Sequence, residues 1–144
     1  MTAANRLLDV ALLAVPETTA STLYGMYDLL CSAGRDWGLL VDGTPGEPRI
    51  RPAIVSADGK RFRAANGVWI EPQRALADGP LPDVVCVLEV LVAPGTRLAG
   101  RHPAEIEWLQ RCYRSGSTLA AACTGALLLA EAGLLDGLDA TTHW

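Results

Sequence analysis

The residues whose types and spacing could do chemistry lie at Ala121-Ala122-Cys123-Thr124-Gly125, where an apolar run meets a helix-forming run. Small residues two positions before and two positions after a nucleophile are typical of a nucleophile elbow, because larger side chains would collide in so tight a turn. Such a turn exposes the Cys123 thiol at the end of a strand. The N–H groups that open the following helix, including that of Thr124, favour the thiolate form. The pattern therefore predicts a nucleophilic, oxidisable cysteine.

A second interpretation of the same residues stays open. Free cysteine is often buried as a small apolar residue, and alanine-rich strand ends are frequent. On this interpretation Cys123 only fills a tight junction between a strand and a helix.

Composition excludes several other classes of protein. The chain has 144 residues, of which 50% are apolar and 19% charged, and its formal net charge is −4. These values favour one folded domain and make this stretch a poor nucleic-acid binder by itself. No apolar run reaches the roughly 18 residues that span a bilayer, and we expect no signal peptide because Asp9 interrupts the first apolar stretch. We expect a cytoplasmic protein that does not contact a membrane.

Metal ligands are in short supply. There are two histidines, and the four cysteines, Cys31, Cys86, Cys112 and Cys123, show no C-x-x-C spacing. We therefore expect no metal and no cofactor.

Alternating strands and helices are predicted to position the cysteine. Residues 7–15 form an apolar run closed by Pro16, which is typical of a parallel strand buried on both faces. Further strands are expected at 49–57, 61–63, 68–70, 83–92 and 118–122, helices at 23–33, 103–115 and 124–132, a helical turn at 73–77, a hairpin turn at Asp58-Gly59 and a loop at 35–48. This alternation indicates an α/β fold with a mainly parallel sheet.

Charged and aromatic residues outside the elbow have plain interpretations. The cations around the expected hairpin are Arg49, Arg51, Lys60, Arg61 and Arg63. They are typical of a solvated edge that discourages strand pairing, with a partner surface as the alternative. The tryptophans Trp37, Trp69, Trp108 and Trp144 are expected to be packing residues, and Trp69 could also line a dimer contact.

The stretch from Ala120 to Gly137, followed by Ala140-Thr141-Thr142-His143-Trp144, resembles the ThiJ/PfpI superfamily, whose members are related to class I glutamine amidotransferases. More narrowly, it resembles the N-terminal sensor domain of AraC-type transcriptional regulators and the sister branch of isocyanide hydratases. The resemblance is specific over the last 25 residues and agrees in layout over the rest. It implies a flavodoxin-like, doubly wound fold. It also implies that residues 1–144 are one domain that is incomplete at its C-terminal end.

The resemblance also implies roles for single residues. Cys123 takes the place of the reactive cysteine, and His143 matches the histidine that follows the elbow. Thr22 stands where relatives carry an acidic residue, and a threonine cannot exchange a proton near neutral pH. After Asp83-Val84-Val85-Cys86-Val87, many relatives have Pro-Gly-Gly at the strand end, whereas this chain has Leu88-Glu89-Val90. Glu89 could supply the missing acid from another strand, or it could simply be solvated or paired with a helix N-cap.

Two departures from the catalytic set favour a sensor over an enzyme. The resemblance implies a ligand-sensing and dimerising domain of an AraC-type regulator, with an unknown small-molecule ligand. DNA would then be bound only by a helix-turn-helix domain beyond residue 144. The alternatives are a cysteine-dependent hydrolase or isocyanide hydratase-like enzyme, and a stress protein that works through oxidation of Cys123.

Overall fold

A parallel sheet forms the centre of the protein in the computed structural model, which describes residues 6–143. Its five strands within that range are β1 (Leu8–Leu13), β2 (Ile50–Ser56), β5 (Arg74–Ala75), β6 (Val84–Val87) and β7 (Thr118–Ala121). Their order is β5-β2-β1-β6-β7, and every pairing is parallel. The expected α/β fold is confirmed.

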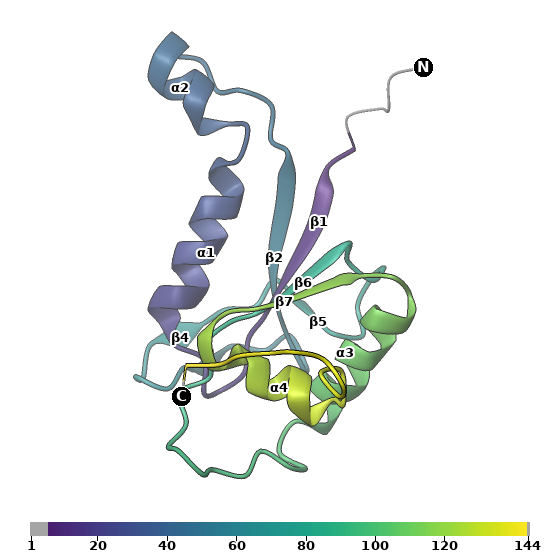
Figure 1. Ribbon diagram of the computed structural model, residues 1–144. Helices are drawn as coiled ribbons and strands as arrows, with labels where there is room; N and C mark the ends of the chain where they lie inside the picture. The colour runs from purple at the N-terminus through teal and green to yellow at the C-terminus, as the bar shows by residue number, and fades with distance from the viewer. Residues whose placement is uncertain (1–5, 144) are drawn as a thin grey trace.

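Helices cover both faces of this sheet (Figure 1). α1 (Ala20–Ser32) covers one face, and α3 (Pro103–Arg114) and α4 (Ala126–Glu131) cover the other. A 3₁₀ turn at Cys123–Gly125 precedes α4, and α2 (Asp36–Asp42) lies beyond the sheet without a buried residue. The short strands β3 (Phe62–Arg63) and β4 (Trp69–Ile70) pair antiparallel in a separate ribbon. Among the described residues, no helix is long and apolar enough to cross a membrane.

The two faces follow from the alternation of side chains along β1. Val10 and Leu12 pack with Leu23 of α1 on one face. Leu13, on the other face, belongs to the cluster that includes Leu109 of α3. Because both faces are covered, β1 is apolar almost throughout, as the sequence predicted.

Three local expectations were wrong. Residues 35–48 are not all loop, because α2 forms at their start and ends at Gly43 with φ 69°. Residues 73–77 contain β5 in place of a helical turn, because Arg74–Ala75 pair with the end of β2. Asp58-Gly59 does turn the chain, but β2 pairs with β1 and β5 and makes no hairpin with β3.

The tryptophans are also less buried than expected. Trp108 is 3% exposed and packs in the core, whereas Trp37 is 77% and Trp69 45% exposed. Trp69 is flanked by Arg61 and Arg63, whose guanidinium carbons lie 4.9 and 4.5 Å from its ring centroid. Trp144 lies outside the described residues.

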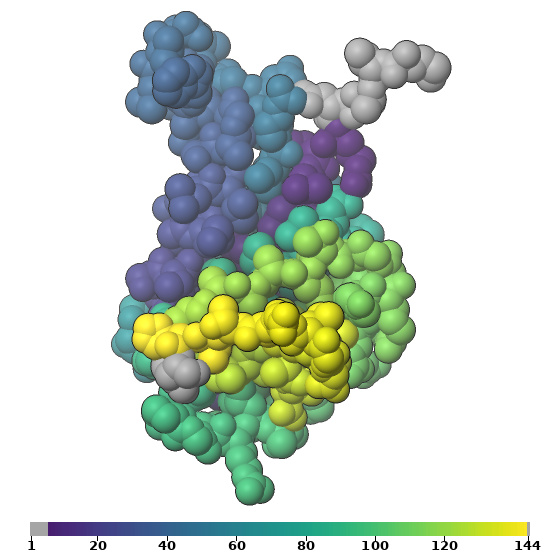
Figure 2. All heavy atoms as spheres, viewed as in Figure 1, coloured from purple at the N-terminus to yellow at the C-terminus, as the bar shows by residue number. Residues whose placement is uncertain are grey.

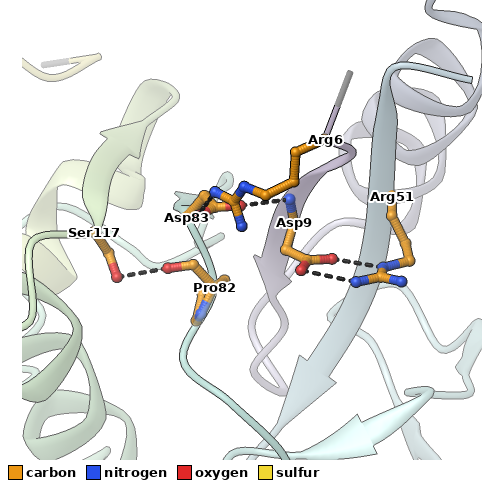
Figure 3. A network of polar contacts seen from close by, with 6 residues as sticks. All are labelled: Arg6, Asp9, Arg51, Pro82, Asp83 and Ser117. Atoms are coloured by element: carbon orange, nitrogen blue, oxygen red, sulfur yellow. Dashed lines mark hydrogen bonds and ion pairs between the residues drawn. The ribbon is translucent and has the colours of Figure 1, made fainter. Parts of the chain in front are cut away.

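Ion pairs tie the strands together at the amino-terminal edge of the sheet (Figure 3). Arg51 binds Asp9 through two hydrogen bonds of 2.6 and 2.8 Å. Arg6 donates to Asp83 at 2.5 Å, and Asp83 also accepts the backbone N–H of Asp9 at 2.9 Å. These hydrogen bonds hold the pKa of both carboxyl groups below its usual value. The elbow lies at the opposite end of the sheet, where the strands have their carboxyl ends.

Candidate functional site

The backbone at Cys123 has the conformation that an elbow requires. Its φ of 55° makes it the one non-glycine residue with positive φ in the described part of the chain. Cys123 is exposed just after the end of β7 and is the first residue of the 3₁₀ turn. A left-handed conformation costs an L-residue free energy and persists only where the surroundings impose it. The neighbouring residues provide that constraint.

Gly125 allows the turn to pass close to β6. A Cβ at position 125 would lie 2.5 Å from the carbonyl oxygen of Leu88 and closer still to that of Val87. Real Cβ atoms do not approach so closely, so residue 125 must lack a side chain. The small residue that the elbow pattern demanded is therefore required by contact with the neighbouring strand.

Thr124 fastens the elbow to the segment that follows β6. Its hydroxyl donates to the carbonyl of Val90 at 2.7 Å and accepts the N–H of Val90 at 3.0 Å. Thr124 is 1% exposed, so both bonds are shielded from water. The role predicted for its backbone N–H remains a prediction, whereas this side-chain role was not foreseen.

His143 lies in the segment that returns to the elbow. The hydroxyl of the preceding residue, Thr142, donates to the backbone carbonyl of Cys123 at 3.2 Å. In Figures 1 and 2 this yellow segment runs back across α4 over the surface of the protein. The structure thus brings His143 into the neighbourhood of Cys123, and its role as a base stays a prediction.

Thr22, Thr19 and Glu89 form a chain of hydrogen bonds at the same edge of the sheet. The hydroxyl of Thr19 donates to a carboxylate oxygen of Glu89 at 2.5 Å, and the hydroxyl oxygens of Thr19 and Thr22 are 2.7 Å apart. Thr19 is the N-cap residue of α1, but its hydroxyl bonds to the Thr22 hydroxyl and does not cap a backbone N–H of that helix. Glu89 is therefore bonded to the N-cap residue of α1, an arrangement that the sequence analysis left open for it, and is linked through Thr19 to Thr22.

The order of the strands explains why these residues meet. Thr19 and Thr22 follow β1, Glu89 follows β6, and Cys123 follows β7; these three strands are neighbours. The carboxyl ends of parallel strands share one edge, where α/β proteins commonly bind ligands. The chain therefore gathers a thiol, two hydroxyls and a carboxylate along one edge.

A buried polar contact lies between His102 and Glu17. His102, 6% exposed, lies with Nε2 3.3 Å from a carboxylate oxygen of Glu17. The backbone carbonyl of Glu17 accepts the N–H of Leu91 at 2.8 Å. Glu17 and His102 thus join the turn after β1 to the segment between β6 and α3. The positions of Glu17 and His102 in the sequence give no indication that the two residues form a pair.

The other cysteines differ from Cys123. Burial raises the pKa of the Cys112 thiol to about 11 and also raises that of Cys86. Cys31 is half-buried on α1, whereas Cys123 is exposed. Exposure and backbone geometry both single out Cys123 as the thiol that external reagents can reach.

Comparison with known proteins places the chain in a family. The sequence model of the DJ-1/PfpI family matches residues 46–144. This chain belongs to the DJ-1/PfpI family. The resemblance of the elbow segment to ThiJ/PfpI proteins is thereby confirmed.

Relatives of this DJ-1/PfpI chain include regulators and an enzyme. The HTH-type transcriptional regulator CdhR of Pseudomonas aeruginosa is 41% identical over 91 residues, which are 63% of this chain and 26% of CdhR. Isonitrile hydratase of Pseudomonas putida is 27% identical over 140 residues, which are 95% of this chain and 53% of that enzyme. The chain thus spans about a quarter of the regulator and about half of the enzyme.

A solved structure shows the same fold. An AraC family transcriptional regulator from Pseudomonas putida superimposes with a TM-score of 0.63 at 21% identity, covering 89% of this chain and 72% of that one. The mainly parallel sheet with flanking helices is therefore the flavodoxin-like fold of the DJ-1/PfpI family.

Proposed function

We propose that this chain is the ligand-sensing and dimerising region of an AraC-type transcriptional regulator that acts in the cytoplasm. The observation that carries the proposal is the 41% identity to the regulator CdhR. DNA binding then belongs to a helix-turn-helix region beyond residue 144. The small-molecule ligand and the second copy are the partners of the present residues.

The polar residues at the elbow support a sensor rather than a catalyst. Thr22 occupies the position of the family's acid, and its hydroxyl lies against Thr19. The carboxylate of Glu89 accepts a short hydrogen bond from Thr19. A threonine at position 22 cannot take or give a proton near neutral pH, so it cannot act as a general acid or base there.

Dimerisation is supported by an apolar stripe on α2. Trp37, Leu40 and Val41 follow the i, i+3, i+4 spacing of one helix face and are 77%, 81% and 59% exposed. Exposed apolar stripes commonly mark protein–protein contacts. We expect two copies of the chain to cover this stripe.

The gene and the solution mass test this proposal. Translation past residue 144 should encode a helix-turn-helix pair, whereas a stop codon soon after a completed domain would rule out the regulator. Light scattering should give twice the mass of one chain, and Leu40→Glu should halve it. Leu138→Glu is the matched control, because Leu138 is also exposed, at 63%, but lies outside α2.

A cysteine-dependent hydratase is the second candidate function. It is favoured by the relative that covers 95% of this chain, the isonitrile hydratase, and by the exposed elbow thiol. Turnover of small isonitriles, nitriles and glyoxal by the chain and by Cys123→Ser tests it. Cysteine-dependent turnover would support the enzyme, and equal inactivity of both proteins would support the sensor.

A further inference from the structure

A hollow opens at the end of the sheet where the parallel strands begin, opposite the end that carries Cys123. Its volume is about 230 Å³, and its wall includes Asp9, Arg51, Ala53, Arg74 and Leu81. Asp9, Arg51 and Ala53 come from the starts of β1 and β2, and Arg74 comes from the edge strand β5. Three adjacent strands and the segment before β6 therefore enclose it.

One of the two guanidinium groups in this wall is already neutralised. Arg51 binds Asp9 through Nε and Nη2 at 2.6 and 2.8 Å. The hydrogen bond from Arg51 lowers the pKa of Asp9, so this carboxyl group is ionised at neutral pH. The pair therefore contributes little net charge to the hollow.

Arg74 is the charge that remains. Its Nη1 donates to the carbonyl oxygens of Asp78 at 2.9 Å and Pro80 at 3.2 Å. No carboxylate in residues 6–143 forms an ion pair with Arg74. These two hydrogen bonds fix the guanidinium group in place and use only Nη1. The Nε and Nη2 donors remain, and together they form the side of the group that can bind a carboxylate through two parallel hydrogen bonds.

Most of the remaining wall is apolar. Ala53 contributes an apolar surface from β2, and Leu81, between Pro80 and Pro82, closes the hollow from the segment before β6. An inorganic anion would gain nothing from these surfaces, whereas a short hydrocarbon chain would be removed from water.

We propose that this hollow binds a small organic monocarboxylate, whose carboxylate pairs with Arg74 and whose apolar part lies against Ala53 and Leu81. The fixed guanidinium group of Arg74 can bind one negative charge, because the neighbouring ion pair adds little net charge. The apolar wall beside it suits a chain of a few carbon atoms. This site is separate from the elbow and does not require Cys123.

The test is titration of the whole chain with hexanoate, followed by calorimetry and by amide NMR shifts. Arg74→Met should weaken hexanoate binding by about tenfold or more, which corresponds to about 1.4 kcal/mol. Ala53→Leu should weaken it equally by filling the hollow without changing a charge. Arg97→Met, at an exposed arginine in the segment before α3, should bind hexanoate as the parent does.

Several outcomes would overturn the proposal. These are unchanged binding in both Arg74→Met and Ala53→Leu, equal affinity for neutral hexanol, or displacement of hexanoate by an equal concentration of inorganic phosphate. Because Arg74 also holds two carbonyl groups, Arg74→Lys tests the charge in a variant that keeps a cation, and it should retain more affinity than Arg74→Met. Loss of binding in Cys123→Ser would place hexanoate at the elbow and would also contradict the proposal.

Discussion

The hydroxyl of Thr19 donates a hydrogen bond of 2.5 Å to the carboxylate of Glu89, across 70 positions of sequence. It joins the start of α1, which follows β1, to the segment that follows β6. The same segment is bound to the elbow through Val90 and Thr124. The bond between Thr19 and Glu89 therefore links α1, which carries Thr22, to the elbow at Cys123.

Removing this bond should destabilise the fold. We expect Thr19→Val to lower the free energy of unfolding by about 1.5–2 kcal/mol, because a part-buried carboxylate loses a charge-assisted hydrogen bond. Thr22→Val is the matched control and should cost less than about 0.5 kcal/mol, because Thr22 is exposed and does not touch Glu89. Urea unfolding of both variants measures the difference. Equal losses would show that the bond to Glu89 has no special weight.

Two glycine-to-alanine substitutions should act in opposite directions. Gly125→Ala should lower stability by about 3 kcal/mol, because the new Cβ would meet the carbonyl oxygens of Val87 and Leu88. Gly25→Ala should raise stability by about 0.5–1 kcal/mol, because nothing lies within 4 Å of its Cβ and glycine weakens a helix interior. Chemical denaturation provides the measurement. A Gly125→Ala protein as stable as the parent would contradict the close approach of the elbow to β6.

The elbow could be predicted from sequence because its signals are local. Small residues flank Cys123 within two positions, and the turn, the strand and the helix are all neighbours in the chain. The hydrogen bond between Thr19 and Glu89 could not be predicted in this way. It depends on β1 lying beside β6, which only the order of strands in the sheet determines.

Helix α2 was missed for a different reason. Gly43, Pro45, Gly46 and Pro48 dominate the second half of residues 35–48 and made the whole stretch look like loop. The stripe of Trp37, Leu40 and Val41 was a helix signal, but its side chains stay exposed, so it is not the stripe of a core helix. The two-residue strand β5 is too short to show an alternating pattern in the sequence. It forms because Arg74 and Ala75 pair with the end of β2.

Alkylation should separate the cysteines by burial. At pH 8, iodoacetamide should modify Cys123 first, because its side chain is exposed on the elbow. Cys112 should react last in the folded protein, because burial raises its pKa to about 11 and leaves roughly one molecule in a thousand as thiolate. Peptide mass spectrometry over a time course measures both rates. Loss of the early phase in Cys123→Ser is the control, and modification of Cys112 at the same rate as Cys123 would contradict the assignment.

Stability should fall in acid because of the ion pairs at the amino-terminal edge of the sheet. The pKa of Asp9 is lowered in the fold mainly by the hydrogen bond from Arg51, and that of Asp83 mainly by the hydrogen bond from Arg6. A carboxyl whose folded pKa is depressed stabilises the fold fully above its unfolded value, near pH 4. That contribution is lost as the pH falls through the lower, folded pKa.

Asp9→Asn should therefore flatten the decline in unfolding free energy below about pH 4, whereas Asp42→Asn, at an exposed carboxylate on α2, should leave it unchanged. Denaturant melts between pH 3 and 7 measure the slopes. The same acid-induced loss in Asp9→Asn as in the parent would show that the Asp9–Arg51 pair does not control it.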